Sequence, residues 1–247
     1  MPLPSYQIVL ASNELISPNV RKLTFEFSKP QSFSYRPGQF VSFSLPYGEK
    51  PLKRSYSIAN LETPDEQGLV TTDYLEIVIS HVANGRATKI FFEAKAGDSF
   101  EISGPVGLLV LGAELPKRIF LIGTGTGMAP YRAMLNQLPK LTEQQFHILF
   151  GAQKQQDMFY LDDFWQAHQA KNIQFHPCLS RQIDNFSFDC YQGYVQQQLV
   201  ELKPDPETDL VYLCGNPNMV DEVFAMLKDK GFGVKQVKRE KYVFSKF

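Results

Sequence analysis

The 247-residue sequence has no excess of positive charge and few cysteines. Lys and Arg number 25 against 26 Asp and Glu, and this balance argues against a nucleic-acid partner. Cys178, Cys190 and Cys214 form no CxxC pair and no group of four, so neither a disulfide framework nor an iron–sulfur or structural zinc site is indicated. We therefore expect no metal site and a reducing, cytoplasmic location.

The pattern expected of a leader or of a membrane segment is also lacking, so we expect neither. Residues 1–15 (MPLPSYQIVLASNEL) contain no basic start followed by a long apolar stretch. No run approaches the roughly 18 apolar residues of a membrane span. We expect no membrane insertion, a monomer and, from the length, one or two domains.

The first part of the chain carries the pattern of antiparallel strands. Six short alternating or β-branched runs, separated by turn residues, lie at 6–12, 20–28, 38–46, 54–60, 73–82 and 99–107. Six such strands predict a barrel or a sandwich. Between the last two, residues 85–98 predict a short helix closed by Gly97, placed to cap one mouth of a barrel.

After residues 111–117 the pattern changes to strands and helices in alternation, which predicts a doubly wound parallel sheet. Five strands are predicted, at 118–123, 146–151, 173–180, 209–215 and 236–244. Apolar residues three and four apart indicate helices around Tyr131, Phe164, Leu199 and Val223. We place the domain boundary between residues 112 and 113, giving domains 1–112 and 113–247.

A glycine-rich loop follows the first of these parallel strands. It comprises Gly123, Thr124, Gly125, Thr126 and Gly127 and leads into an amphipathic helix. Glycines let a phosphate approach the backbone N–H groups, so the loop suits a pyrophosphate, although a tight turn without a ligand is the alternative. The other strand ends, at 151–153, 179–182 and 214–217, are also polar or glycine-rich, as a nucleotide cleft requires.

The segment RSYSIAN at 54–60 combines a cation, an aromatic ring and hydroxyls in a predicted strand. Arg54 suits a phosphate and Tyr56 offers a flat apolar face. Strand alternation places these two on one side and Ser57 on the other, so Ser57 can reach the same ligand only if the strand ends or bulges there. The alternative is a surface pair on an edge strand.

These segments together resemble the ferredoxin-NADP reductase superfamily. The resemblance rests on RPGQF at 36–40, RSYSIAN, NGRAT at 84–88, GTGTGMAPYR at 123–132, CGNPNMV at 214–220 and the E-x-Y of Glu240 and Tyr242. It implies an antiparallel six-stranded β-barrel flavin domain followed by a doubly wound, five-stranded parallel nucleotide domain. It also implies FAD as cofactor, hydride transfer with NADP(H), and single electrons exchanged with a small acidic carrier, a ferredoxin or flavodoxin.

The resemblance assigns roles to individual residues. The catalytic residues are Ser57, Cys214, Glu240 and Tyr242. The FAD-binding residues are Arg54, Tyr56, Ser57, Gly85, Arg86, Ala87, Thr88, Tyr242 and Phe247. The NADP-binding residues are Gly123, Thr124, Gly125, Thr126, Gly127, Ser180, Arg181, Cys214, Gly215 and Asn216. Because VFSKF follows Tyr242, either Tyr242 or Phe247 stacks on the flavin, and Cys214 is alternatively a neutral core residue.

Basic residues suggest which nucleotide and which electron carrier the protein prefers. Ser180 and Arg181 match the pair that binds the 2'-phosphate in NADP-dependent relatives, whereas a second basic residue is lacking where Tyr194 follows Gly193. Seven Lys or Arg in residues 228–247 suit an acidic carrier, or form a solvated face. Two alternatives remain: a flavin reductase or the reductase component of an oxygenase, and a non-catalytic nucleotide-binding module.

Overall fold

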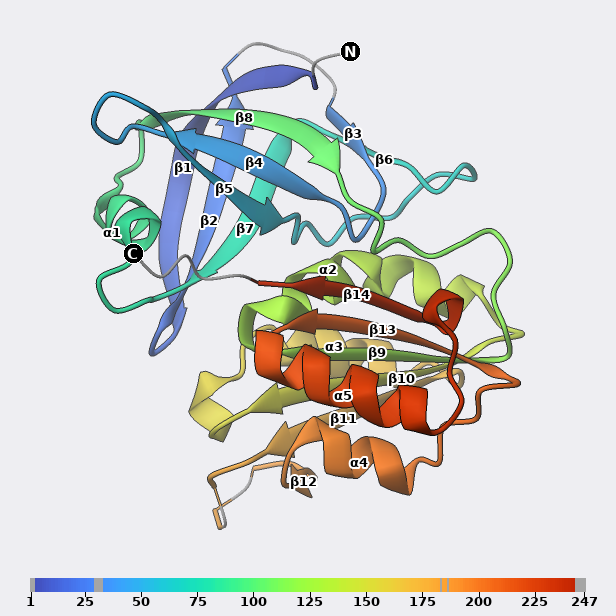
Figure 1. The fold of residues 1–247 in the computed structure, drawn as a ribbon. Coiled ribbons are helices and arrows are strands. Elements are labelled where there is room, and N and C mark those ends of the chain that lie inside the picture. The colour runs from blue at the N-terminus through green and yellow to red at the C-terminus, as the bar shows by residue number, and fades with distance from the viewer. Residues whose placement is uncertain (1–2, 29–32, 183, 186, 243–247) are drawn as a thin grey trace. The chain divides into compact units, whose positions relative to one another are not determined.

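The computed structural model describes residues 3–28, 33–182, 184–185 and 187–242 (Figure 1). The chain forms two compact units. The first unit combines the chain up to Val110 with Ala129–Asn136, and the second combines Leu111–Met128 with the chain from Gln137 onward. The domain boundary at residue 112 stays a prediction.

The first unit contains a six-stranded sheet in which every pairing is antiparallel, as predicted. In spatial order its strands are β5 (Leu52–Ser57), β4 (Phe40–Leu45), β8 (Ser99–Val106), β1 (Ser5–Ser17), β2 (Val20–Phe27) and β7 (Tyr74–Ser80). The Ala59 N–H, just beyond β5, donates to the Glu76 carbonyl on β7 at 2.8 Å, so the two edges of the sheet meet. A separate pair, β3 (Phe33–Tyr35) and β6 (Val70–Thr72), was not predicted because three residues leave no periodic signal.

The core of the first unit is aromatic. Alternation along β4 buries Val41, Phe43 and Leu45. Helix α1 (Arg86–Glu93) adds Phe91, whose ring meets that of Phe43 edge-on at 5.1 Å. The predicted helix 85–98 was too long: it ends at Glu93, and a turn follows in which Gly97 has φ +98°.

The second unit contains a parallel sheet. In spatial order its strands are β12 (Tyr191–Gln192), β11 (Ile173–Leu179), β10 (Gln145–Ala152), β9 (Arg118–Thr124), β13 (Asp209–Gly215) and β14 (Val237–Lys241). The predicted count of five strands was wrong, because β12 has only two residues and no periodicity of its own. The last predicted strand, 236–244, corresponds to β14, and its residues 243 and 244 lie outside the described residues.

Helices cover both faces of this sheet, which confirms the doubly wound class. Leu199 of α4 (Val195–Glu201) and Val223 of α5 (Pro217–Asp229) share one buried cluster with Leu149 of β10. The next residue of β10, Phe150, points to the opposite face and meets Phe164 of α3 (Leu161–His168) at 5.9 Å. None of the helices among the described residues has the length and apolar character needed to cross a membrane.

The glycine loop leads into three short helical segments: η1 (Gly125–Met128), α2 (Ala129–Met134) and η2 (Leu135–Lys140). The sequence predicted one continuous helix here. The 3-10 geometry of η2 coincides with Pro139, which has no N–H for an α-helical bond. Met128 belongs to the second unit and Ala129 to the first, so the chain passes from one unit to the other at this peptide bond.

Candidate functional site

The topology of the second unit fixes where a ligand can bind. From β9 the chain moves through β10 and β11 to β12, and then returns to place β13 and β14 on the other side of β9. In open parallel sheets such a reversal opens a crevice at the carboxyl ends of the two strands involved. The glycine loop follows β9 and Asn216 follows β13, so both predicted nucleotide segments lie at this reversal.

Close backbone packing joins the two loops. A Cβ on Gly127 would lie 2.4 Å from the Cys214 carbonyl oxygen, and a Cβ on Gly215 would lie 2.6 Å from the Thr124 carbonyl oxygen. The Asn216 N–H also donates to Thr124 Oγ1 at 3.2 Å. Only glycine fits at 127 and 215, because any side chain there would separate the loops.

The outer side of the glycine loop is open. Gly125 has φ +53°, and no atom lies within 4 Å of the position that its Cβ would take. Thr124 and Thr126 on either side are only partly buried. The loop therefore presents backbone to open space where a phosphate could approach, and its role as a pyrophosphate cradle stays a prediction.

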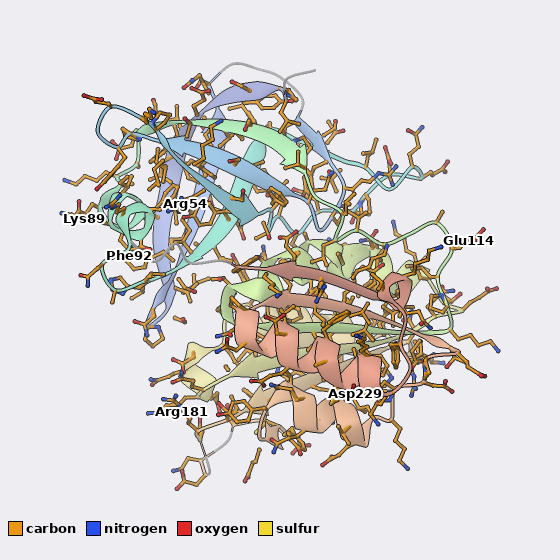
Figure 2. All side chains as sticks on the ribbon, viewed as in Figure 1. Arg54, Lys89, Phe92, Glu114, Arg181 and Asp229 are labelled. Atoms are coloured by element: carbon orange, nitrogen blue, oxygen red, sulfur yellow. The ribbon has the colours of Figure 1, made fainter. Side chains whose placement is uncertain are left out.

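Ser180 and Arg181 extend the site to the next strands. They follow β11, and their N–H groups donate to the carbonyls of Ala152, the last residue of β10, and Gln153 at 3.0 and 2.9 Å. Arg181 is exposed (Figure 2). A cation therefore stands at the carboxyl edge of the sheet with its backbone fixed.

Gln155, which the sequence did not single out, connects the segment after β10 with the segment after β11. Gln155 accepts a hydrogen bond from the Ser187 N–H at 3.0 Å, and its own N–H donates to Gln182 Oε1 at 2.7 Å. These contacts join segments about 30 residues apart, and a lone glutamine gives no signal in the sequence.

Cys214, Glu240 and Tyr242 come together at the end of β13. Cys214 lies opposite Glu240 in the parallel register of β13 and β14. The Tyr242 N–H donates to the Gly215 carbonyl at 3.0 Å, and its hydroxyl donates to the Thr126 carbonyl at 3.4 Å. Tyr242 thus lies against both loops of the nucleotide crevice.

The chemistry of Cys214 follows from its burial. The side chain is fully buried, which raises the pKa of its thiol far above the usual range, and the negative charge of Glu240 raises it further. A hydrogen bond with Tyr242 acts in the other direction and is the smaller effect. Cys214 is therefore a neutral thiol that can pack against a ligand but cannot act as a thiolate.

Asn216 already has a structural role. The Asn216 side chain caps α5, because its Oδ1 accepts the N–H groups of Asn218 and Met219 at 2.9 and 3.4 Å. That oxygen is therefore already engaged. Phe247 lies outside the described residues, so the choice between Phe247 and Tyr242 stays open.

In the first unit, the strand carrying RSYSIAN ends where the predicted role of Ser57 requires it to end. β5 stops at Ser57, which is 4% exposed. The next N–H groups leave the strand pattern: that of Ile58 donates to the Gln39 carbonyl and that of Ala59 to the Glu76 carbonyl. Ser57 is thus the last residue of the strand, paired with Phe40, and its role stays a prediction.

The ring of Tyr56 packs between two aromatic neighbours. Its ring meets Phe43 and Phe91 edge-on, with centroids 5.7 and 5.3 Å apart. Burial raises the pKa of Tyr56 well above the usual range, although the charge of Arg54 opposes this. Arg54 lies on β5 (Figure 2), and strand alternation places it on the same side as Tyr56, two residues later.

The segment Gly85–Thr88 begins α1, and Phe91 of the same helix contacts Tyr56. A Cβ on Gly85 would lie 2.9 Å from Thr88 Oγ1, so the turn needs glycine there. The Arg86 guanidinium lies 4.4 Å from the ring centroid of Tyr47. Tyr47 was not predicted, and because it is 39 residues from Arg86, only the fold brings them together.

Comparison with known proteins matches both halves. Residues 7–110 match an oxidoreductase FAD-binding domain and residues 121–224 an oxidoreductase NAD-binding domain. Ferredoxin–NADP reductase B of Sorangium cellulosum (strain So ce56) is 30% identical over 237 residues, with 92% of this chain and 93% of that protein covered. The chain belongs to the ferredoxin-NADP reductase family.

Other members of the family serve other electron-transfer systems. One component of the Na(+)-translocating NADH-quinone reductase of Psychrobacter cryohalolentis is 27% identical, and the match covers 92% of this chain. This chain spans only 64% of that component's length, and 47% of the length of its Neisseria meningitidis counterpart. Among solved structures, the Amycolatopsis cytochrome P450 reductase GcoB is 26% identical with a TM-score of 0.82, covering 97% of this chain and 70% of that one.

Family membership identifies the cofactors. The chain carries an oxidoreductase FAD-binding domain with an antiparallel sheet and an oxidoreductase NAD-binding domain with a parallel sheet, so FAD and a nicotinamide nucleotide are its ligands. The described residues fit these groups: Tyr56 offers a ring held by Phe43 and Phe91, and the open backbone at Gly125 can receive a phosphate.

Proposed function

We propose that the protein is a reductase that takes hydride from NADPH into FAD and passes electrons singly to a ferredoxin or flavodoxin. The observation that carries the nucleotide preference is the placement of Ser180 and Arg181 at the carboxyl edge of the sheet. An exposed guanidinium on a fixed backbone suits the 2'-phosphate that distinguishes NADPH from NADH.

FAD, when bound, supplies the ability to accept two electrons with a proton and to release electrons one at a time. Around it, Arg54 and the turn Gly85–Thr88 hold the phosphates, and Tyr56 lies against one ring face. Ser57 donates a hydrogen bond at the reactive edge. This assignment is supported by the end of β5 at Ser57 and by the contact of Tyr56 with α1.

For the nucleotide, the backbone of Gly123–Gly127 binds the pyrophosphate while Gly215 and Asn216 close the crevice. Cys214 packs beside the nicotinamide as a neutral thiol, and Glu240, opposite it on the next strand, would relay the proton involved. Tyr242 would cover the flavin face that the nicotinamide approaches, with Phe247 as the alternative. The hydrogen bonds of Tyr242 to both loops support its place at this crevice.

Exposed lysines near the C-terminus support the choice of an acidic carrier. Several cations near the C-terminus are already engaged: Lys238 lies over Tyr212, Arg239 over Phe224, and Lys241 pairs with Asp221. Lys228, Lys230 and Lys235 are exposed and provide the charge that would steer an acidic carrier. We further propose that the protein works as a monomer in the cytoplasm.

The test compares electron acceptors under anaerobic conditions. The FAD-loaded protein is mixed with NADPH and an acidic ferredoxin or flavodoxin, and in parallel with free FMN, and reduction is followed spectroscopically. We expect turnover with the carrier at low carrier concentration. Turnover with free FMN alone would contradict the carrier assignment.

A second candidate is the reductase component of an oxygenase, or an NAD(P)H-dependent flavin reductase. It is supported by the similarity to the P450 reductase GcoB and by a relative whose name specifies NADH. Isolation of the protein without bound flavin, together with saturable reduction of free FMN, would favour the flavin reductase.

A further inference from the structure

The helix after the glycine loop is anchored in the first unit by one arginine. Arg132 of α2 donates from Nη1 to Glu76 Oε1 at 2.6 Å and to the Ala59 carbonyl at 2.5 Å. Both ionic side chains are only 11% exposed. Such a buried, charge-assisted pair fixes geometry more strongly than a surface ion pair does.

The acceptors of Arg132 belong to the segment that follows Ser57. The Ala59 N–H donates to the Glu76 carbonyl at 2.8 Å, and the Glu76 N–H donates to Asn60 Oδ1 at 2.7 Å. Asn60 Nδ2 in turn donates to the Tyr74 carbonyl at 3.0 Å. Hydrogen bonds to Tyr74 and Glu76 therefore fix the chain just beyond Ser57, and Arg132 is a further partner.

Arg132 also lies five residues beyond the last glycine of the loop. The glycine loop and Met128 belong to the second unit, whereas α2 packs in the first, where Met134 lies against the turn at Gly38. The loop is thus covalently joined to a helix that the first unit holds in place.

We propose that Arg132 is a positioning residue for hydride transfer, because it ties the glycine loop that binds NADPH to the segment of Ser57 that faces the flavin. The proposal rests on the proposed function. Arg132 itself is not among the proposed binding residues of either ligand, so its loss leaves binding of FAD and of NADPH nearly intact. What is lost is the alignment on which the transfer rate depends.

The experiment uses the FAD-loaded protein in anaerobic stopped flow with NADPH. For Arg132→Ala we expect hydride transfer to slow by about ten- to a hundredfold, with the nucleotide dissociation constant changed less than about threefold. Arg132→Lys keeps the charge without the planar fork, so it should recover part of the rate. Because Arg132→Lys is the milder change, it carries the test if Arg132→Ala does not fold.

A matched control is Arg118→Ala, which breaks another arginine–carboxylate pair, with Asp209, at the amino end of β9. It should reduce stability without slowing hydride transfer. An equal rate loss in both alanine variants, or a loss of FAD from the Arg132 variants with an unchanged rate in the loaded fraction, would overturn the proposal. If the wild type itself is not reduced by NADPH, the proposed function fails instead.

Discussion

At the scale of single residues, the proposed preference for NADPH rests on Arg181. Replacing Arg181 by Glu removes the cation that we propose for the 2'-phosphate and adds a repelling charge. We expect the KM for NADPH to rise at least about tenfold while the KM for NADH changes little. Steady-state kinetics with both nucleotides measure this.

Lys171→Glu serves as the control for that substitution. It makes the same charge change on an exposed residue next to the amino end of β11, whereas Arg181 follows the carboxyl end of the same strand. Equal effects of Arg181→Glu on NADPH and NADH would contradict the assignment.

A buried histidine pair makes stability depend on pH. His147 Nδ1 and His176 Nε2 are 3.1 Å apart, and His147 stacks on Phe120. Burial lowers the pKa of each to about 4, with further lowering of His147 by His176 and of His176 by His168. Above about pH 6.5 both are neutral in the folded and unfolded states, so their contribution is complete.

As the pH falls from about 6.5 to about 4, the unfolded chain binds protons that the native pair does not accept. The free energy of unfolding should therefore drop by about 2 kcal/mol for each histidine, or about 4 kcal/mol for the pair, between pH 7 and pH 5 in urea titrations. His147→Gln should flatten this dependence, whereas His81→Gln, an exposed histidine, should retain it. An unchanged pH dependence in His147→Gln would refute this explanation.

At the scale of elements, the loops after β9 and β13 pack so closely that Gly127 should not tolerate a side chain. Gly127→Ala places a methyl group against the Cys214 carbonyl, where backbone on both sides leaves no room. We expect affinity for NADPH to fall at least about tenfold while the flavin spectrum is retained, because the proposed FAD-binding residues of α1 and β5 lie in the first unit. Equilibrium titration of the FAD-loaded protein measures both.

Gly112→Ala is the matched control, since Gly112 is exposed and its nearest neighbour would be Glu114 O at 3.5 Å. It should behave as the wild type does. Unchanged NADPH affinity in Gly127→Ala would show that the loops are not needed in this arrangement.

Elements with a clear period could be predicted from the sequence, and contacts between distant residues could not. The alternation of β4 and the helical spacing of α5 were visible, because each buries every second residue or every third and fourth. β12 was missed because two residues carry no period. The pairing of Arg132 with Glu76 was missed because 56 residues separate them and neither stands in a recognisable pattern.

For the site, the sequence could predict where a strand must end, because side chains alternate along a strand. Ser57 could share a ligand with Tyr56 only at a strand end, and β5 ends there. The glycines at 125 and 127 looked equivalent in the sequence. The structure separates them, because Gly125 faces open space and Gly127 faces the backbone of Cys214.

At the scale of the whole molecule, association with a carrier should depend on salt. If Lys228, Lys230 and Lys235 steer an acidic carrier, the second-order rate with it should fall steeply as ionic strength rises. Lys230→Glu/Lys235→Glu should lower the rate at low salt and weaken its salt dependence. Reduction of neutral free quinones should be unaffected in the same protein, and salt-independent rates with the carrier would argue against electrostatic docking.

The most direct measurement is the visible spectrum of the purified protein, followed anaerobically after mixing with NADPH and with NADH. We predict the absorbance of bound oxidised FAD near one equivalent per chain, and bleaching that is faster with NADPH than with NADH. A protein loaded with FAD that neither nucleotide bleaches would contradict the central claim.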